Sequence, residues 1–262
     1  MMYGIDISEH QTRRGIPDFK KIKASGKDFV IIRVGWGGYE GPIDVDDNFT
    51  ATVNAAIKAG IHIGLYVYTY NRTPSAAKIT ANAVCDIADN YKGKIDFPIF
   101  YDVEEQRDSC LISQGREGLT DTVIAFLKTV EARGYYAAWY TYTYFISTAL
   151  DYNKLNAYDL WLADYRGKKP LYYCGIYQYT VLGNEGKKGK DYFSTGQQEG
   201  IIGNCDQNKS YKDYPAIIRR AELNGFKKED DKPLEPNNSI DYKAAYEGIM
   251  KDLESIINRY TL

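Results

Sequence analysis

The chain has 262 residues, of which 33 are Lys or Arg and 35 are Asp or Glu, so its formal charge is −2. This near balance disfavours nucleic acid as the main partner, and no apolar run approaches the roughly 18 residues that a membrane span needs. Apolar residues make up 44% of the chain, which is typical of a globular protein with a sizeable core.

Eight short runs of apolar, β-branched and aromatic residues predict strands. They are Tyr3–Ile7, Phe29–Val34, Ile61–Thr69, Phe97–Val103, Tyr135–Tyr140, Leu160–Ala163, Gly175–Tyr179 and Ile201–Cys205. Segments of helical period separate them in the first half, around residues 17–25, 47–59, 75–91 and 114–133, whereas only a weak helix near 144–150 follows the fifth strand. This alternation indicates βαβ units, so we expect an α/β fold. An irregular barrel related to the (β/α)₈ type is favoured, and a doubly wound open sheet is the alternative.

The last part of the chain has a different composition. Residues 226–240 are polar and contain proline, which predicts a linker, and residues 241–262 have the period of an amphipathic helix. We therefore expect residues 1–225 to form the barrel. The helix is expected either to dock on a monomeric barrel or to mediate a homo-oligomer.

Four carboxylates fall at the ends of predicted strands, where a barrel places its chemistry. Asp6 ends the first strand, Asp102 and Glu104 end the fourth, and Asp206 follows the eighth. Side chains two apart in a strand point to the same side, so Asp102 and Glu104 are expected to share one pocket. Neighbouring carboxylates raise the proton affinity of one of them, and a carboxylic acid that stays protonated near neutral pH is what a glycosidase requires.

Aromatic residues gather at the same strand ends, and the 25 tyrosines of the chain stand beside only 9 phenylalanines. Tyrosine and tryptophan offer a sugar ring both a stacking face and a hydrogen-bonding edge. The candidates include Trp36, Tyr66, Tyr68 and Trp139, with Asp164 as a neighbour of the pocket. These features predict a saccharide-binding cleft.

Metal and cofactor motifs are not recognisable. The histidines and cysteines match no zinc or redox spacing, and no phosphate-binding loop is present. We therefore expect neither a metal nor a cofactor. A hydrolase that holds a metal on the carboxylate cluster and a non-catalytic sugar-binding barrel stay as alternatives.

The run from Gly4 to Gln11, GIDISEHQ, resembles the D-[IV]-S-x-x-Q signature of the family 25 glycoside hydrolases, which include phage endolysins and bacterial autolysins. Further matches follow in order at Phe29–Arg33, Gly64–Tyr66, Tyr101–Glu104, Trp161–Tyr165, Gln178–Thr180 and Gly203–Asn208. The resemblance spans roughly residues 3–223.

This resemblance implies an irregular TIM-like (β/α)₅β₃ barrel with the activity of a lysozyme, or N-acetylmuramidase. Such an enzyme hydrolyses the β-1,4 bond between N-acetylmuramic acid and N-acetylglucosamine in the glycan strands of bacterial peptidoglycan. Glu104 is then the general acid, with Asp6, Asp102 and Asp206 as the other site carboxylates. Tyr66 lines the subsite for the muramic ring, with Tyr68, Trp139 and Gln178 as its neighbours.

The resemblance also implies retention of configuration assisted by the acetamido group of the substrate, with a carboxylate such as Asp102 steadying that group. Direct attack by a carboxylate about 5–5.5 Å from the acid, and inversion with a gap of about 6.5–9.5 Å, stay open.

The N-terminus enters a predicted strand without the basic and apolar segments of a signal peptide. We therefore expect an enzyme made in the bacterial cytoplasm that reaches the wall after release, or an extracellular enzyme whose signal is not part of this sequence.

Overall fold

The computed structural model describes residues 1–104, 109–166, 169–180 and 197–227. The helix expected at 241–262 and nearly all of the linker expected at 226–240 lie outside these residues, so both stay predictions. The described part of the chain belongs to one compact unit, Met1–Lys227.

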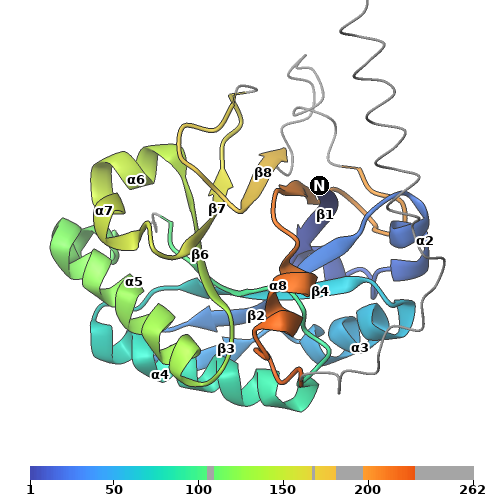
Figure 1. Ribbon diagram of the computed structural model, residues 1–262, viewed down its shortest axis with the longest axis horizontal. Helices are drawn as coiled ribbons and strands as arrows, with labels where there is room; N and C mark the ends of the chain where they lie inside the picture. Colours follow the sequence, from blue (N-terminus) through green and yellow to red (C-terminus); the bar gives the residue numbers. More distant parts are fainter. Residues whose placement is uncertain (105–108, 167–168, 181–196, 228–262) are drawn as a thin grey trace, which may run out of the picture. The chain divides into compact units, whose positions relative to one another are not determined.

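Eight strands of the described residues close into a barrel (Figure 1). They are β1 (Met2–Ile7), β2 (Phe29–Gly37), β4 (His62–Thr69), β5 (Ile99–Asp102), β6 (Ala137–Tyr142), β7 (Asp159–Ala163), β8 (Ile176–Thr180) and β9 (Asp206–Ser210). The ring runs β1-β9-β8-β7-β6-β5-β4-β2, and parallel pairing of β1 with β2 closes it. The irregular barrel expected from the sequence is confirmed, and the open sheet is wrong.

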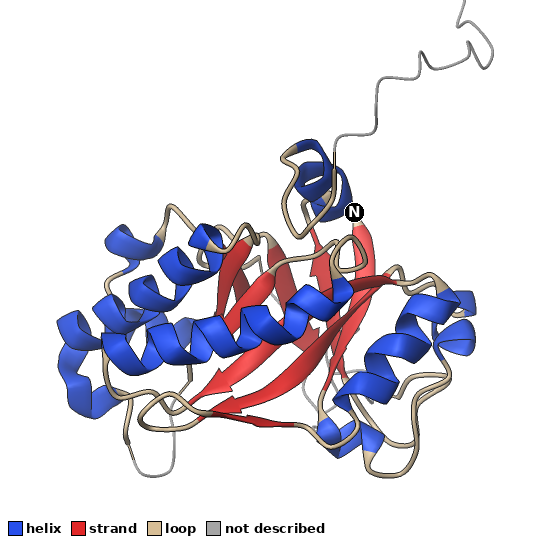
Figure 2. Cartoon of the chain, turned by 90° about the horizontal axis from the view of Figure 1, so that it is seen from below, coloured by secondary structure: helices blue, strands red, loops and turns tan. Residues whose placement is uncertain are grey.

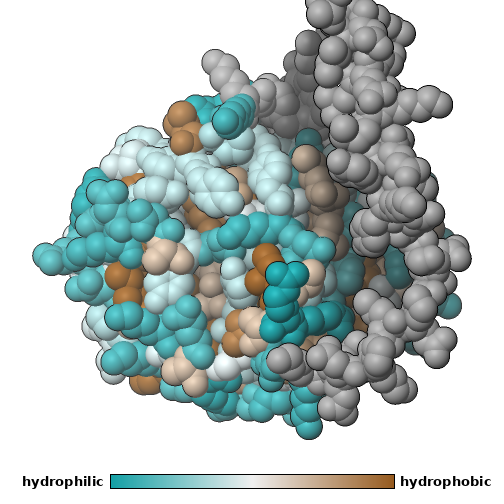
Figure 3. Space-filling model, in the orientation of Figure 1, coloured by the Kyte–Doolittle hydropathy of each residue, from teal (hydrophilic) through white to brown (hydrophobic). Residues whose placement is uncertain are grey.

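The helices lie on the outside of this sheet (Figure 2). Those that follow strands β1 to β6 include α2 (Phe19–Ala24), α3 (Phe49–Ala59), α4 (Pro74–Ala88), α5 (Gly115–Ala132), α6 (Thr143–Ala149) and α7 (Tyr152–Leu155). The remaining described helices are α1 (Glu9–Thr12), α8 (Tyr214–Arg220) and the 3₁₀ turns η1 (Asp89–Tyr91) and η2 (Ile112–Gln114). Local chemistry sets several ends, because Thr73 caps α4 before Pro74 and Gly60 ends α3 in the left-handed conformation. The face that Figure 3 shows mixes hydrophilic residues with isolated hydrophobic ones.

A short strand, β3 (Ile43–Val45), was not expected and pairs antiparallel with the end of β2. Gly35 permits this close approach, because a Cβ at that position would lie 1.9 Å from the backbone oxygen of Asp44. The edge of the barrel mouth is therefore extended on the side of β2.

The last strand differs from the expectation of Ile201–Cys205. The strand is β9, and it runs antiparallel to both of its neighbours, β1 and β8. The sequence of β9 is polar and hides the strand pattern, yet Asn208 and Ser210 are completely buried. Asp206 therefore begins a strand instead of following one. Because β9 runs in the opposite direction, its start reaches the rim where β1 ends, and Asp206 pairs in register with Asp6.

Aromatic side chains fill the lower part of the barrel. Phe29 and Phe97 stack with ring centroids 4.5 Å apart, and Tyr214 of α8 packs 5.3 Å from Phe97. Gly4 makes room for this packing, since a Cβ there would lie 2.5 Å from the ring of Phe29. Pro98 immediately precedes β5, as its missing donor requires. One end of the barrel is thus packed, and the polar chemistry lies at the other.

Candidate active site

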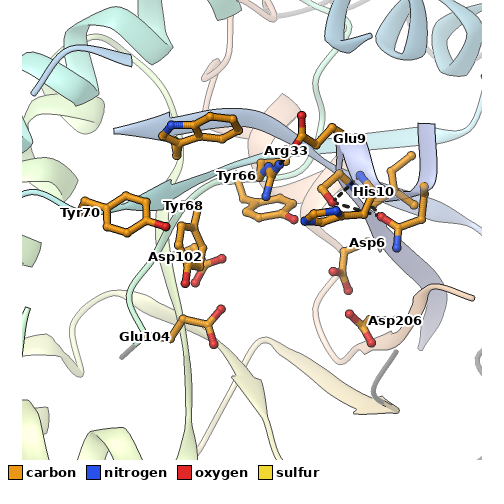
Figure 4. Close-up of a pocket in the computed structure, with 14 residues that line it drawn as sticks. Asp6, Glu9, His10, Arg33, Tyr66, Tyr68, Tyr70, Asp102, Glu104 and Asp206 are labelled. Atoms are coloured by element: carbon orange, nitrogen blue, oxygen red, sulfur yellow. Dashed lines mark hydrogen bonds and ion pairs between the residues drawn. The ribbon is translucent and has the colours of Figure 1, made fainter. Parts of the chain in front are cut away.

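A pocket of about 480 Å³ opens at the mouth of the barrel, at the ends of β1, β2, β4 and β5 (Figure 4). The sequence-predicted residues that line it are Asp6, Trp36, Tyr66, Tyr68, Asp102, Glu104 and Asp206. The fold therefore brings the four predicted carboxylates together. Figure 4 shows Asp102 and Glu104 on one side of the pocket and Asp6 and Asp206 on the other.

Asp102 and Glu104 carry raised proton affinities. Asp102 is buried, and its Oδ1 has no hydrogen-bond partner among the described residues. Burial raises the pKa of Asp102 well above its usual value, and the charges of Glu104 and Asp6 raise it further. Burial also raises the pKa of Glu104 to about 7, with a contribution from Asp6. Glu104 is therefore placed to give up and take back a proton near neutral pH.

Asp6 is held differently from the other two. Its Oδ2 accepts a 2.7 Å hydrogen bond from Asn208 Nδ2 and a 2.9 Å hydrogen bond from Gln178 Nε2. Burial raises the pKa of Asp6 to about 6, and the two amide donors act against that rise. Because amide donors stabilise the ionised form, Asp6 gives up its proton more readily than Asp102.

The orientation of the Asn208 amide is set by a donor on its other side. Trp161 Nε1 donates to Asn208 Oδ1 at 2.8 Å, and an indole can only donate. The amide nitrogen of Asn208 must therefore face Asp6. Tyr140 donates to Gln178 Oε1 at 3.0 Å and Tyr165 donates to the same oxygen, so the nitrogen of Gln178 is also turned toward Asp6.

Gln178 was expected to contact substrate, and the structure corrects this. Its side chain is 3% exposed, faces the inside of the barrel and binds Asp6 beneath the pocket. Sequence reasoning had no means of assigning this role, because Gln178 and Asp6 are 172 residues apart in the chain. Gln178 is a support for a site carboxylate.

One further expectation, Trp139 as a ligand contact, was wrong for a geometric reason, and Asp164 as a neighbour of the pocket stays a prediction. Trp139 is completely buried in the layer between sheet and helices, 6.4 Å from Tyr152, because Ala138 and Tyr140 take the inward positions of β6. Asp164 lines a separate groove, and Arg166 Nε donates to its Oδ1 at 2.7 Å. Burial alone would raise the pKa of Asp164, but the hydrogen bonds from Arg166 leave it lowered.

The signature residues Ser8 and Gln11 have a structural role. Ser8 caps α1, and Gln11 Oε1 accepts a 2.9 Å hydrogen bond from the backbone nitrogen of Ser8. Gln11 Nε2 also donates to the backbone oxygen of Asn204 at 3.2 Å. The motif thus ties the end of β1 to the segment that leads into β9, and so holds Asp6 and Asp206 at one rim.

Arg33 is a pocket residue to which sequence reasoning gave no role, although it lies within a matched motif. Its Nε lies 3.0 Å from Asp46 Oδ2, its Nη2 lies 3.4 Å from Glu9 Oε1, and its guanidinium lies 5.3 Å from the ring of Trp36. This buried ion pair supports the wall formed by Tyr66 and Trp36. His10, Tyr70 and Glu9 also line the pocket.

Two kinds of feature are absent from the described residues. In this part of the chain, no group of three or more His, Cys, Asp or Glu side chains could hold a metal ion. Nor does any of its helices combine the length and the hydrophobicity that crossing a membrane requires.

Comparison with known families agrees with this geometry. The model of the family described as glycosyl hydrolases family 25 matches residues 5–187. The chain belongs to family 25. The match includes Asp6, Asp102 and Glu104, and it confirms the resemblance seen in the sequence motifs.

Relatives of this family 25 chain include the autolytic lysozyme of Clostridium acetobutylicum, which is 29% identical over 203 residues, or 74% of the chain and 56% of the relative. Among solved structures, the modular autolysin LytC from Streptococcus pneumoniae is 25% identical with a TM-score of 0.63, over 79% of the chain and 46% of LytC. The catalytic domain of endolysin ply40 from bacteriophage P40 of Listeria monocytogenes is 22% identical with a TM-score of 0.64, over 86% and 98%. The chain spans about half the length of the first two proteins, and the third likeness shows the same fold.

Proposed function

We propose that this protein is a lysozyme, an N-acetylmuramidase that hydrolyses the β-1,4 bond between N-acetylmuramic acid and N-acetylglucosamine in peptidoglycan. The observation that carries the proposal is the position of Glu104. It lies in a pocket with an aromatic wall and three further carboxylates, and its pKa is about 7. A general acid works best when its pKa lies near the operating pH. Family membership supplies the class of reaction.

Glu104 acts first as the acid in the proposed mechanism. It donates its proton to the oxygen that leaves with N-acetylglucosamine, while the acetamido oxygen of the muramic ring attacks the anomeric carbon from the opposite face. Asp102 steadies the acetamido N–H in this step. Glu104, now ionised, takes a proton from the water that opens the cyclic intermediate, so the configuration is retained. Carboxylates around the pocket stabilise the positive charge that develops on the sugar ring.

Direct attack by Asp102 on the anomeric carbon is the competing route, and it would form a covalent ester. Glycan strands whose muramic residues have lost the acetyl group distinguish the two, since an amine has no oxygen to attack. The acetamido route is supported if the wild type does not hydrolyse the deacetylated strands while the Glu104→Gln variant still binds them. Hydrolysis at a normal rate, with an enzyme–glycan adduct detected by mass spectrometry, supports direct attack.

The function is tested on purified peptidoglycan, with mass analysis of the fragments released. We expect products that end in reducing muramic acid from the wild type and none from Glu104→Gln. Glu117→Gln is the matched control, because Glu117 is 84% exposed on α5. Products that end in reducing N-acetylglucosamine would indicate a glucosaminidase and free stem peptides an amidase. Full activity of Glu104→Gln would remove Glu104 from the role of acid.

The same assay addresses the alternatives. A sugar-binding barrel without catalysis would release no fragments from peptidoglycan but would still bind it. A hydrolase that depends on a metal would lose activity with a chelator and regain it when the metal is added back. We expect the chelator to have no effect, since the proposed mechanism uses only carboxyl groups and the substrate.

The bacterial cell wall is the proposed place of action, because relatives of the chain are named as autolysins and endolysins. The protein is proposed to reach it by release from the cytoplasm or by export. The state of assembly is tested by comparing the solution mass of the full chain with that of a chain cut after Gly225. A dimer that becomes a monomer on truncation would assign assembly to residues 226–262.

A further inference from the structure

A second cavity lies beside the proposed active site. It has a volume of about 600 Å³ and lies between the start of α6, the end of β7 and residues 171 and 172. The residues that shape it are Tyr142, Tyr144, Ala163, Tyr165, Leu171 and Tyr172. We call it the tyrosine groove.

The tyrosine groove opens at the same mouth of the barrel as the catalytic pocket. Tyr140, Trp161 and Ala163 belong to the core inside the barrel. Tyr142 lies two positions after Tyr140 in β6, and Ala163 lies two positions after Trp161 in β7, so each is on the same face of its strand as the earlier residue. Tyr165 joins the two cavities, because it lines the groove while its hydroxyl donates to the Gln178 side chain that binds Asp6. The side chains of Tyr165 and Gln178 thus link the groove to Asp6 of the pocket.

The order of strands places Glu104 between the two cavities. The pocket lies at β1, β2, β4 and β5, Glu104 follows the end of β5, and the groove lies at the next two strands, β6 and β7. A general acid lies beside the oxygen that it protonates, so the two sugars joined by that oxygen extend to opposite sides of it. If the pocket holds the ring that is attacked, the departing sugars extend toward β6 and β7.

We propose that the tyrosine groove binds the sugars on the leaving side of the cleaved bond, a site that rests on the proposed muramidase function. The groove offers tyrosine rings on which a sugar can stack, and Tyr144 and Leu171 are 68% and 65% exposed. Its charged residues, Asp164 and Arg166, form an ion pair with each other. That lining fits the uncharged N-acetylglucosamine ring next to the cleaved bond better than the charged stem peptide of the wall.

The test compares two peptide-free substrates that share the same donor disaccharide. One is a tetrasaccharide of two N-acetylglucosamine–N-acetylmuramic acid units, and the other carries a 4-nitrophenyl group in place of the leaving sugars. Tyr144→Ala is the groove variant. Tyr173→Ala is the matched control, because Tyr173 is 76% exposed and is not among the residues that line the groove.

We expect Tyr144→Ala to raise KM for the tetrasaccharide about three- to tenfold, as the loss of one stacking ring predicts. The kcat/KM of Tyr144→Ala for the nitrophenyl substrate should be unchanged. Tyr173→Ala should keep the wild-type KM for the tetrasaccharide and the wild-type kcat/KM for the nitrophenyl substrate. Equal losses on both substrates, or no change on the tetrasaccharide, would overturn the proposal. So would a loss confined to substrates that carry stem peptides, since this would assign the groove to the peptide.

Failure of the proposed function can be told apart from failure of this site. If the wild type cleaves neither substrate, the muramidase assignment is wrong. Binding of the tetrasaccharide to the wild type and to Tyr144→Ala, measured by calorimetry, still decides whether the groove holds sugar. A Kd that is equal for the two proteins would overturn the groove proposal.

Discussion

Asn208 donates a 2.7 Å hydrogen bond to Asp6 across the β1–β9 pair, and the indole of Trp161 leaves the amide of Asn208 with only one suitable orientation. The barrel therefore supplies a fixed donor to one of its four clustered carboxylates. Asp102 has an Oδ1 without such a donor among the described residues. This difference separates the proton affinities of acids that share one pocket.

Removal of the Asn208 donor should move the acidic side of the activity profile. Asn208→Leu takes a hydrogen bond from ionised Asp6, so the pKa of Asp6, about 6 in the wild type, should rise by about 1 unit or more. If ionised Asp6 is needed for the reaction, kcat/KM will start to fall at a correspondingly higher pH. Ser210→Ala, in the same strand, is the control. A uniform drop in kcat/KM at every pH would instead indicate a loss of structure.

The alkaline side of the profile should report Glu104. The acid must be protonated in the free enzyme, so kcat/KM should fall as pH rises through the Glu104 pKa of about 7. The measurement is kcat/KM on soluble glycan between pH 4 and 9 at constant ionic strength. Constant activity up to pH 9 would contradict the role of Glu104 as the acid.

Glu104 should also reduce the stability of the fold at alkaline pH. Its folded pKa of about 7 lies above the ordinary value of 4.5, so below pH 4.5 it is protonated in both the folded and unfolded states and has no effect. Between pH 4.5 and 7 the unfolded chain loses the Glu104 proton while the folded state keeps it, so stability falls, and above pH 7 the loss is complete at on the order of 3 kcal/mol. Glu104→Gln should thus unfold at higher urea concentration than the wild type at pH 8 and at an equal concentration at pH 4. An equal difference at both pH values would argue against this cause.

The ion pair of Arg33 with Asp46 is buried, so removing only one of its two charges should lower the free energy of unfolding. The Arg33→Met variant leaves the Asp46 carboxylate buried without its cation, and we expect a loss of about 3 kcal/mol in the free energy of unfolding. The double variant Arg33→Met, Asp46→Leu should recover part of that loss, because it removes the uncompensated charge. Urea unfolding of the two variants measures this. A double variant that is less stable than Arg33→Met would contradict the explanation.

Trp36 and Trp139 were both candidates for sugar binding in the sequence, but their replacement should have different effects on KM and on stability. Trp36 lines the pocket, so Trp36→Ala should raise KM for glycan with little change in stability. Trp139 lies in the core outside the barrel, so Trp139→Phe should lower the free energy of unfolding by about 1–3 kcal/mol and leave KM unchanged. A rise in KM for Trp139→Phe at full stability would contradict the assignment.

Local patterns in the sequence were sufficient for much of the fold. The apolar runs of seven of the eight barrel strands and the helical stretches between them predicted the barrel. The two-residue spacing of Asp102 and Glu104 placed both side chains in one pocket, because alternation along a strand depends on backbone geometry alone. Motifs in order along the chain indicated family 25.

Only the tertiary structure decided which side chains face the mouth of the barrel and which support them. A shift of one residue moves a strand side chain to the other face, so Trp139 was misplaced although its strand was predicted. The direction of β9 depends on pairing with β1, and this pairing brings Asp206 opposite Asp6. Asp6 accepts hydrogen bonds from Asn208, 202 residues away in the chain, and from Gln178. Trp161 in turn donates to Asn208. Proton affinities depend on such long-range contacts and on burial, and local sequence patterns contain neither.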